Sequence, residues 1–491
     1  MRSATRTTRE QYIEWKGSRD CRLPISDLHD RLAPTGNWQL EIGNVMKIVR
    51  VIARLNVGGP ARHVVWLTAG LQGVDCDTLL VAGTVPPGEE DMGYFAAEHR
   101  VKPLFIPAMS REISFKDAFT IWKIYRLFCR ESPDVVHTHT AKAGTVGRVA
   151  GFLYRWLTPA TLLGRRRSCL FVHTYHGHIF HSYYGPLKTR LFLTIEKILA
   201  RLITDRIVVV SEQQRREIHE RFGVGRSDQF VVIPLGLDIQ SFADWPKRRQ
   251  LFRDELGSKG DELLVGIVGR LTEIKNHELF ISAVAILKNK LADEKFRPRP
   301  GSPGRQPGWG GGIRFVVIGD GSLRDRLEAQ VHALGLSADV IFAGSRRDPE
   351  NFYAALDIVA VTSLNEGTPL TLIEAMANAR PVIATEVGGV VDLLGEVIEE
   401  HRNERYIVRR RGLTIPSNDP AAVGAGLFHL IENAELRAEL GARGLEYVAS
   451  NYSRERLLHD IKALYQQLLE RSGGIASSPE SNQRGAENCV Y

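Results

Sequence analysis

The strongest constraint on the fold is a repeated alternation of short apolar runs with longer amphipathic segments. In the first half of the chain the apolar runs cover residues 48–53, 78–82, 135–137, 170–174 and 207–210. In the second half they cover residues 264–268, 315–318, 340–343, 358–361 and 381–384. Continuous apolar runs are typical of strands buried on both faces, and strands that alternate with helices form parallel sheets. We therefore expect an α/β protein with two parallel sheets, joined near residues 233–238, and a site where the carboxyl ends of the strands meet a crevice.

The length of the chain also indicates two domains. A chain of 491 residues exceeds what one ordinary hydrophobic core serves. We expect an N-terminal domain at 46–236 and a C-terminal domain at 237–471, with a polar extension at 1–45 and a tail at 472–491 that lacks the apolar content to fold alone. The extension is either flexible or the product of a start codon placed upstream of the real one, and the second is favoured. A stretch rich in proline and glycine at 297–312 predicts a surface loop insertion.

The stretch at 365–376 carries the clearest chemical signal. It places Glu366 in a glycine-containing loop and Glu374 in the helix that follows. Thr368 is expected to cap that helix and Pro369 to occupy its first turn, where no backbone N–H is needed. A helix N-terminus suits a phosphate, and carboxylates beside it can accept hydrogen bonds from sugar hydroxyls. The stretch therefore points to a nucleotide sugar.

A second interpretation of the same helix stays open at this point. Thr371, Glu374 and Asn378 share helical spacing, so Glu374 could belong to a solvated polar stripe that binds nothing. A short motif of this kind does not decide between the two interpretations by itself.

Two further junctions between a strand and a loop fit a phosphate site. Gly269 and Arg270 follow an apolar run, and Lys275 comes shortly after them. Guanidinium and ammonium groups both match phosphate oxygens. Gly319 and Gly321 follow the next apolar run, in a turn that needs the conformational freedom of glycine. Each junction is common in α/β proteins, and it is their order along the chain that favours a single site.

With these residues in view, the chain resembles the family 4 retaining glycosyltransferases, which have the GT-B fold of two Rossmann-like domains facing across a cleft. Its second half resembles the C-terminal half of that family in the order of its motifs, which are Gly269-Arg270, Lys275, 319–321, Glu366 and Glu374. Its first half resembles bacterial members that build envelope and capsular polysaccharides, in the glycine loop at 55–63 and the histidine segments at 137–144 and 173–178. The resemblance covers nearly the whole folded part of the chain.

The resemblance implies a role for each site residue. Arg270 and Lys275 would stabilise the charge of the leaving diphosphate. Glu374 would hold the ribose hydroxyls, and Glu366 would lie near the donor hexose. His176 would lie near the donor sugar and the acceptor. The remaining contacts with the nucleotide sugar would come from Gly58, Gly59, Gly269, Gly319, Gly321, Gly367, Thr368, Pro369 and Leu370.

The resemblance also assigns the domains. The N-terminal domain would bind the acceptor and the C-terminal domain would bind the nucleotide sugar. The last helix would pack back toward the N-terminal domain.

Histidines gather near the ends of two predicted strands, at His137, His139, His173, His176, His178 and His181. Clustered histidines can bind a metal, but no acidic partner pattern accompanies them, so no metal site is expected. The histidines other than His176 are expected to shape the acceptor pocket or to be satisfied cap residues. Asp75-Cys76-Asp77 mimics the D-x-D pattern of metal-dependent transferases, yet it precedes a strand instead of ending one and is not expected to bind a metal.

Composition limits the partners. The net charge is +7, but the basic stretches lack a known docking motif, so nucleic-acid binding is not expected. Five scattered cysteines without metal-ligand spacing indicate a reducing compartment. No apolar run is long enough to span a bilayer, and a cytoplasmic location is expected. The aromatic, apolar and basic segment at 183–202 is either an interfacial helix on an anionic membrane, which the resemblance favours, or a core helix with basic ends.

The resemblance implies transfer of a hexose or N-acetylhexosamine-type sugar from a UDP- or GDP-type nucleotide-diphosphate sugar, without a cofactor, to a lipid-linked or glycan acceptor in cell-envelope polysaccharide biosynthesis. No residue pair fits a double-displacement nucleophile and acid, so attack on the same face of the sugar is favoured. A nucleotide-sugar epimerase on the same fold and a catalytically silent subunit of a glycosylation complex stay open as alternatives. A nicotinamide enzyme is disfavoured because no G-x-G-x-x-G follows the first predicted strand.

Overall fold

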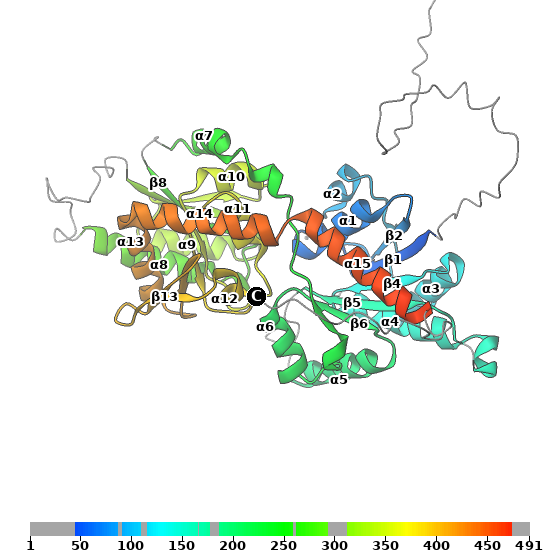
Figure 1. Cartoon of the computed structure of the whole chain (residues 1–491). Coiled ribbons are helices and arrows are strands. Elements are labelled where there is room, and N and C mark those ends of the chain that lie inside the picture. Colours follow the sequence, from blue (N-terminus) through cyan, green and yellow to red (C-terminus); the bar gives the residue numbers. More distant parts are fainter. Residues whose placement is uncertain are drawn as a thin grey trace, which may run out of the picture. The chain divides into compact units, whose positions relative to one another are not determined.

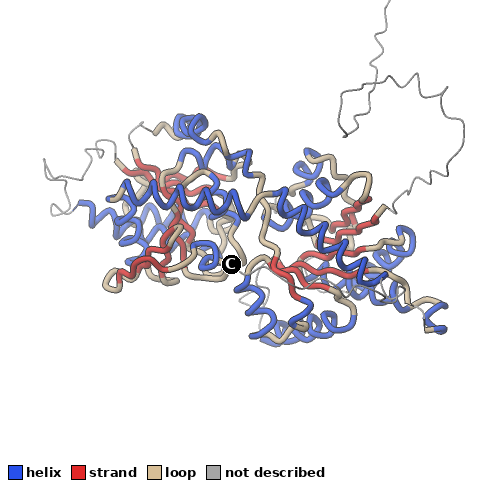
Figure 2. Tube along the Cα trace, in the orientation of Figure 1, coloured by secondary structure: helices blue, strands red, loops and turns tan. Residues whose placement is uncertain are grey.

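Two sheets, each flanked by helices, make up the chain (Figure 1; Figure 2). The computed structural model describes residues 45–86, 91–109, 115–164, 166–176, 186–258, 262–292 and 312–473. The expected N-terminal extension up to residue 44, the loop insertion up to residue 311, the tail after residue 473, and His178 and His181 lie outside the described residues.

The first sheet is wholly parallel and has the strand order β3-β2-β1-β4-β5-β6-β7. Its strands are β1 (Met46–Ile52), β2 (Cys76–Ala82), β3 (Leu104–Phe105), β4 (Val135–His139), β5 (Leu170–Tyr175), β6 (Arg206–Val209) and β7 (Phe230–Val232). The helices between them are α1 (Gly59–Leu71), α2 (Gly93–Glu98), α3 (Lys116–Glu131), α4 (Ala141–Trp156), α5 (Pro186–Leu202) and α6 (Glu212–Arg215). Because β1 lies inside the sheet and the order reverses there, the loops after β1 and β4 diverge at a switch point where such sheets bind ligands.

The second sheet has the order β10-β9-β8-β11-β12-β15-β14-β13. Its strands are β8 (Leu263–Val268), β9 (Ile313–Ile318), β10 (Val340–Gly344), β11 (Ile358–Val361), β12 (Val382–Thr385), β13 (Val397–His401), β14 (Tyr406–Arg409) and β15 (Gly412–Ile415). The helices of this half are α7 (Trp245–Glu255), α8 (His277–Ala292), α9 (Arg324–Ala333), α10 (Pro349–Ala355), α11 (Leu370–Ala377), α12 (Val390–Leu394), α13 (Pro420–Glu432), α14 (Ala434–Asn451) and α15 (Arg454–Gly473). Pairing is parallel from β10 to β15, whereas β14 runs antiparallel to both of its neighbours.

The predicted apolar runs all form strands, and the expectation of two parallel-sheet α/β domains is confirmed. The strands that the sequence analysis missed lie toward sheet edges: β3, β7, β13, β14 and β15. β13 contains two glutamates and a histidine, and most of its side chains are exposed, so it offers no apolar run to detect. The domain boundaries at 236 and 471 stay predictions.

The last helix, α15, packs on the first sheet although it follows the second sheet in the chain (Figure 1). Leu457, Ile461 and Tyr465 are buried in one cluster with Ile48 of β1 and Val172 of β5. Apolar side chains spaced along one face of α15 therefore complete the core on one face of the first sheet.

Helix α5 is anchored to the core by a buried charge. The Arg148 guanidinium of α4 donates to Glu196 of α5 at 2.6 Å, and the Tyr175 hydroxyl donates to the same carboxylate at 2.5 Å. The outer face of α5 exposes Leu191 and Ile198. One face of α5 thus packs against the core, and the other face exposes apolar side chains at the surface. No helix among the described residues is long and apolar enough to cross a membrane.

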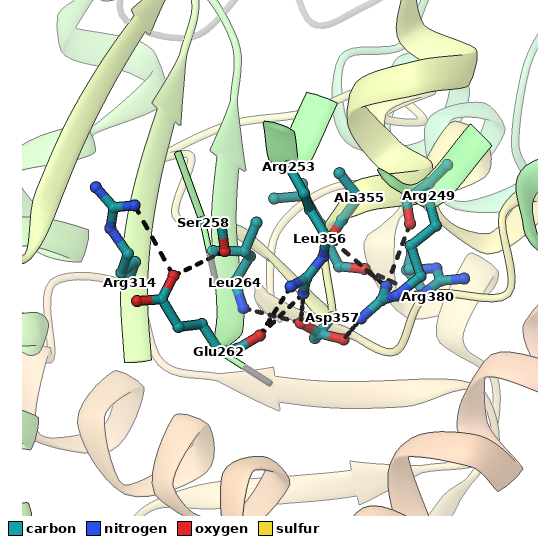
Figure 3. A network of polar contacts seen from close by, with 11 residues as sticks. Arg249, Arg253, Ser258, Glu262, Leu264, Arg314, Ala355, Leu356, Asp357 and Arg380 are labelled. Atoms are coloured by element: carbon teal, nitrogen blue, oxygen red, sulfur yellow. Dashed lines mark hydrogen bonds and ion pairs between the residues drawn. The ribbon is translucent and has the colours of Figure 1, made fainter. Parts of the chain in front are cut away.

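An arginine network attaches α7 and α10 to the second sheet (Figure 3). Asp357, just before β11, accepts hydrogen bonds from Arg249 at 2.5 Å, from Arg253 at 2.6 Å and from the backbone N–H of Leu264 at 2.8 Å. Arg253 is almost fully buried and also donates to the carbonyl of Ala355 at the end of α10. The Asp357 carboxylate therefore neutralises a guanidinium that has little access to water.

Asp357→Ala is expected to lower the free energy of unfolding by about 3–5 kcal/mol, the range for a buried ion pair that loses one partner. The substitution leaves the Arg253 guanidinium and the Leu264 N–H without this acceptor, and urea denaturation measures the loss. The matched control is Glu396→Ala, which removes an exposed pair with Arg410 and should change little. A loss no larger than that of the control would contradict the role given to Asp357.

Candidate active site

A cavity of about 650 Å³ lies beyond the carboxyl ends of β8, β9 and β10. It is lined by four of the predicted residues, Gly269, Arg270, Gly319 and Gly321. Asn56 and Val57, in the loop after β1, also line it. Loops that follow strands of both sheets thus contribute to one cavity, which is the place where α/β proteins bind ligands.

Arg270 is an unpaired cation among the described residues that line this cavity. Its side chain is exposed, and it makes no hydrogen bond or ion pair with any residue in the described part of the chain. The turn beside it needs glycine, because a Cβ on Gly319, at a φ of +140°, would lie 2.0 Å from the carbonyl oxygen of Gly269. The two glycine turns therefore touch backbone to backbone and leave the Arg270 guanidinium facing the cavity.

Lys275 and Glu366 form an ion pair between two adjacent strand-end loops. The ammonium of Lys275 donates to Glu366 Oε1 at 2.6 Å, and the hydroxyl of Ser363 donates to the same oxygen at 2.6 Å. The backbone N–H of Leu364 donates to the carbonyl of Ile274 at 2.8 Å, which joins the same two loops. The structure thus brings together two residues, 91 positions apart, that the sequence analysis assigned to one site.

The start of α11 differs from the expectation. The helix begins at Leu370, and Pro369 lies before it with φ −72° and ψ 114°, so the prediction that Pro369 occupies the first turn is wrong. The prediction that Thr368 caps the helix is also wrong, since its hydroxyl donates to the carbonyl of Val210 at 3.5 Å. The extended conformation of Pro369 separates Thr368 from the helix N-terminus and turns its side chain toward the first half of the chain.

Glu374 is buried in α11 and paired with a residue of the first half. Arg62, in α1, donates to Glu374 Oε1 at 2.7 Å. Burial raises the pKa of Glu374, and the positive charge of Arg62 opposes that rise. Asn378 is fully buried and donates to the carbonyl of Glu374. The interpretation of this helix face as a solvated stripe is therefore wrong.

Gly58 and Gly59 stand at the start of α1, close to the start of α11. A Cβ on Gly59 would lie 3.9 Å from a methyl carbon of Leu370. Arg62 follows one turn later and reaches Glu374. The glycine loop of the first half and the glutamate helix of the second half are therefore in contact.

A second glycine pair supports the Glu366 loop and was missed by the sequence analysis. A Cβ on Gly388, whose φ is +51°, would lie 1.6 Å from the carbonyl oxygen of Glu366. The backbone N–H of Gly389 donates to the carbonyl of Gly367 at 2.6 Å. The available signal was a Gly-Gly step separated by two residues from the end of the apolar strand β12, similar to the position of Gly319 after β9.

His176 contacts two other histidines. Its Nε2 lies 3.0 Å from Nδ1 of His139, at the end of β4, and its ring lies 4.7 Å from that of His63 in α1. Burial is the main cause that lowers the pKa of all three imidazoles, for His176 to about 3. These rings are therefore neutral at pH 7.

The other two described histidines of the cluster bond to neighbouring side chains. His137 bonds the Tyr465 hydroxyl of α15 at 2.6 Å and the Thr174 hydroxyl at 2.7 Å. His173 bonds the Thr138 hydroxyl at 2.9 Å. Both side chains are fully buried, so they bind neighbouring elements together and do not reach the cavity.

The D-x-D-like segment is engaged in surface contacts. Asp75 pairs with Lys462 of α15 at 3.1 Å, and Asp77 accepts from Gln72 at 3.4 Å. Cys76 between them begins β2, so these carboxylates lie at the amino end of a strand, far along the chain from the loops that line the cavity.

The predicted site residues fall into four groups, one of which is His176 beside His63 and His139. Gly269, Arg270, Gly319 and Gly321 line the cavity, Lys275 and Glu366 form the ion pair, and Glu374 with residues 367–370 and the α1 glycines forms the contact between the halves. Arg62, His63 and Gly388 belong with them and were not selected from the sequence. Lys275, Glu366, Glu374 and His176 are not among the described residues that line the cavity.

Two parallel sheets with ligand-binding loops at their carboxyl ends are the architecture of GT-B glycosyltransferases. Residues 57–241 match the family model described as Glycosyltransferase Family 4, and residues 248–447 match the one described as Glycosyl transferases group 1. The chain belongs to the family 4 glycosyltransferases and has the GT-B fold.

Curated relatives agree with this assignment. The chain is 30% identical over 292 residues to the UDP-Gal:alpha-D-GlcNAc-diphosphoundecaprenol alpha-1,3-galactosyltransferase of Escherichia coli, an alignment covering 59% of this chain and 67% of that protein. It is 24% identical over 377 residues to the capsular polysaccharide biosynthesis glycosyltransferase CapM of Staphylococcus aureus, covering 74% and 85% of the two chains. The solved structure of Anabaena HepE in complex with UDP shares the fold, with a TM-score of 0.63, 19% identity and coverage of 87% and 100%.

A pH prediction follows from His277 at the start of α8. Burial, and to a lesser extent the charge of Lys275, lowers the pKa of His277 to about 4. In the unfolded chain an imidazole has a pKa near 6.5, so below that pH the unfolded state binds a proton that the folded state does not. Stability should therefore fall as the pH falls, by about 2 kcal/mol between pH 7.5 and 5 from this residue alone.

Urea denaturation of His277→Gln at several pH values measures this contribution. The variant should lose about that much less stability than the wild type over the same pH range, whereas the exposed His332→Gln should behave as the wild type. Identical pH dependence in His277→Gln and the wild type would contradict the assignment.

Proposed function

We propose that this glycosyltransferase is retaining and metal-independent, and that it transfers a hexose or N-acetylhexosamine-type sugar from a UDP- or GDP-type nucleotide-diphosphate sugar. The acceptor is a lipid-linked or free glycan used in cell-envelope polysaccharide synthesis. The observation that carries the proposal is the Lys275–Glu366 ion pair, because it unites a phosphate-type cation and a sugar-type carboxylate at adjacent strand ends.

The proposed chemistry concerns the leaving diphosphate. As its bond to the sugar breaks, negative charge gathers on the phosphate oxygens. Lys275, held by Glu366, and Arg270, which faces the cavity, would supply positive charge beside the diphosphate, and charge placed where it develops favours the transition state more than the ground state. These two cations would do the work that a divalent ion does in metal-dependent transferases, which is why we propose a metal-independent reaction.

Retention would follow from attack on the same face of the sugar. The bond from the anomeric carbon to the diphosphate breaks, and the acceptor oxygen forms its bond to that carbon on the face just vacated. The acceptor proton passes to the departing phosphate oxygen. Glu366 would position the sugar hydroxyls, and the neutral imidazole of His176 would accept or donate a hydrogen bond to the sugar or the acceptor.

Glu374 would hold the ribose. A buried carboxylate accepts strong hydrogen bonds when it is ionised, and the charge of Arg62 favours the ionised form against the effect of burial. The α1 glycines beside Leu370 would let the loop of the first half approach the diphosphate.

The choice of donor and acceptor is supported by the relatives. The name of the Escherichia coli relative includes a UDP sugar and a diphosphoundecaprenol-linked sugar. Helix α5 exposes Arg190, Leu191, Ile198, Arg201 and Leu202, a mixture that suits an anionic membrane surface where a lipid-linked acceptor would be found. We therefore propose a peripheral association of this face with such a surface.

Arg270→Ala and Lys275→Ala should each lower turnover by about 100-fold or more, as expected for the loss of a group that stabilises transition-state charge. Release of nucleoside diphosphate from a panel of UDP and GDP sugars measures turnover and identifies the donor. Arg410→Ala, an exposed arginine at the end of β14, is the control and should retain full activity. Near-normal turnover in both site variants would remove these cations from the mechanism.

Glu374→Gln should weaken the binding of donor and of free nucleoside diphosphate alike, by about 1.5–3 kcal/mol, because both contain the ribose. Glu366→Gln should weaken the intact donor more than the free diphosphate, because its partner is the sugar. Calorimetry with both ligands separates the two roles.

Arg62→Met should also weaken both ligands, because it removes the positive charge that favours the ionised form of Glu374. Unchanged affinity for both ligands in Glu374→Gln would contradict the assignment of Glu374 to the ribose. An equal loss for both ligands in Glu366→Gln would refute its assignment to the sugar.

A further inference from the structure

Three imidazoles from different elements meet beside the candidate active site. His63 comes from the first turns of α1, His139 ends β4, and His176 follows β5. One ring nitrogen from each lies within 4.8 Å of the other two. The site residue His176 is therefore one corner of a compact histidine triad formed by His63, His139 and His176.

The topology of the first sheet creates this triad. β4 lies between β1 and β5, and His139 is level with Ile52 of β1 and Thr174 of β5. Because the three strands are parallel, their carboxyl ends deliver the start of α1, the end of β4 and the residue after β5 to the same edge. The chain separation explains why the sequence analysis, which weighed only the clustered histidines, did not include His63.

The triad leaves most of its ring nitrogens without a partner. His139 Nδ1 and His176 Nε2 contact each other at 3.0 Å. Both nitrogens of His63, Nε2 of His139 and Nδ1 of His176 have no hydrogen-bond partner among the described residues, although all are buried. Buried polar atoms are usually satisfied, since leaving one unpaired costs about 1–3 kcal/mol. Each neutral imidazole carries one lone pair, so the triad offers three, one of which is used in the contact between His139 and His176. A metal ion that takes all three lone pairs would replace that contact and satisfy the three rings together.

The other two described histidines of the cluster, His137 and His173, have hydrogen-bond partners outside the triad. His137 uses both ring nitrogens on Tyr465 and Thr174, and His173 bonds Thr138. Nε2 of His173 is also without a partner, but among the described residues only His63, His139 and His176 bring one ring nitrogen each within 4.8 Å of the other two.

We propose that His63, His139 and His176 bind a zinc ion, and that the bound ion inhibits the proposed transferase by occupying His176. Neutral imidazole is a ligand for Zn²⁺, and three imidazoles with one open position are a known arrangement for it. Calcium and magnesium prefer oxygen ligands, which the triad does not offer. The inhibitory part of the inference rests on the proposed function, whereas the binding part does not.

The residues around the triad favour reversible binding of the zinc ion. None of the three ligands is a carboxylate, so the charge of the ion is not compensated within the triad. The cation Arg50, buried in β1, is close enough to contribute to the lowered pKa values of His63 and His139. Ligating histidines in permanent sites normally donate their second nitrogen to a carboxylate or carbonyl, and no such contact stands here among the described residues. Binding should therefore respond to the free zinc concentration.

Cobalt titration of the full chain tests the binding directly. Co²⁺ in a tetrahedral site with nitrogen ligands absorbs visible light strongly, and Zn²⁺ should displace it at one equivalent per chain. His63→Gln should weaken binding by more than about 100-fold, since the loss of an outer partner alone can reach that factor. His332→Gln, which removes an exposed histidine of α9, should bind as the wild type does.

Equal binding by wild type and His63→Gln, or no cobalt absorption in the wild type, would overturn the proposal. If His63→Gln fails to fold, X-ray absorption of the zinc-loaded wild type decides the question. Three nitrogen ligands with imidazole scattering at about 2.0 Å support the triad, and oxygen ligands alone overturn it.

The inhibitory step has its own measurement. Zinc should lower turnover of the wild type, a chelator should restore it, and His63→Gln should be insensitive to zinc at the same concentration. Zinc bound by the triad without any change in turnover would overturn the inhibitory role and leave the binding site standing. A chain that transfers no sugar at all would contradict the proposed function without touching the cobalt result.

Discussion

The ion pair between Lys275 and Glu366 joins the loops that follow two neighbouring strands, and the geometry of the candidate site depends on it. Each side chain is partly buried, so each charge needs the other to remain at the strand ends. Ser363 shares the carboxylate, and the Thr362 hydroxyl donates to the carbonyl of Asn276. The loops after β8 and β11 are therefore fixed to each other before any ligand binds. A site that is held in place in this way does not have to reorganise during the reaction.

The second glutamate, Glu374, is also paired with a cation, which comes from the other half of the chain. Burial raises the pKa of Glu374, and the positive charge of Arg62 opposes that rise, so the ion pair favours the ionised form that the proposed hydrogen bond to ribose would use. Glu366 and Glu374 are therefore each paired with one cation. Arg270 has no such partner among the described residues, and it faces the cavity. Binding of an anionic diphosphate would add the negative charge that Arg270 lacks. The arrangement explains why a nucleotide could be recognised without a large change in the charges of the site.

Much of this could be predicted from the sequence, for identifiable reasons. Buried parallel strands produce continuous apolar runs, so β8 and β11 and the loops that follow them could be predicted from the pattern of apolar residues along the chain. Glu366 and Lys275 could be assigned to one site because the order of their motifs along the chain resembles that of a known family. Arg62 and His63 could not be found in this way, since their partners lie on other elements and nothing local marks the contact. The capping role of Thr368 failed because it depends on the conformation of a single residue, Pro369, which local preference did not determine.

The most direct test of the account is a crystal structure of the chain with a nucleoside-diphosphate sugar bound. Diphosphate oxygens are expected within hydrogen-bond distance of both Arg270 and Lys275, at about 2.7–3.2 Å. Ribose hydroxyls are expected on Glu374 and the sugar beside Glu366. A diphosphate bound away from both cations, or a ribose that does not touch Glu374, would contradict the central claim that these loops form the donor site.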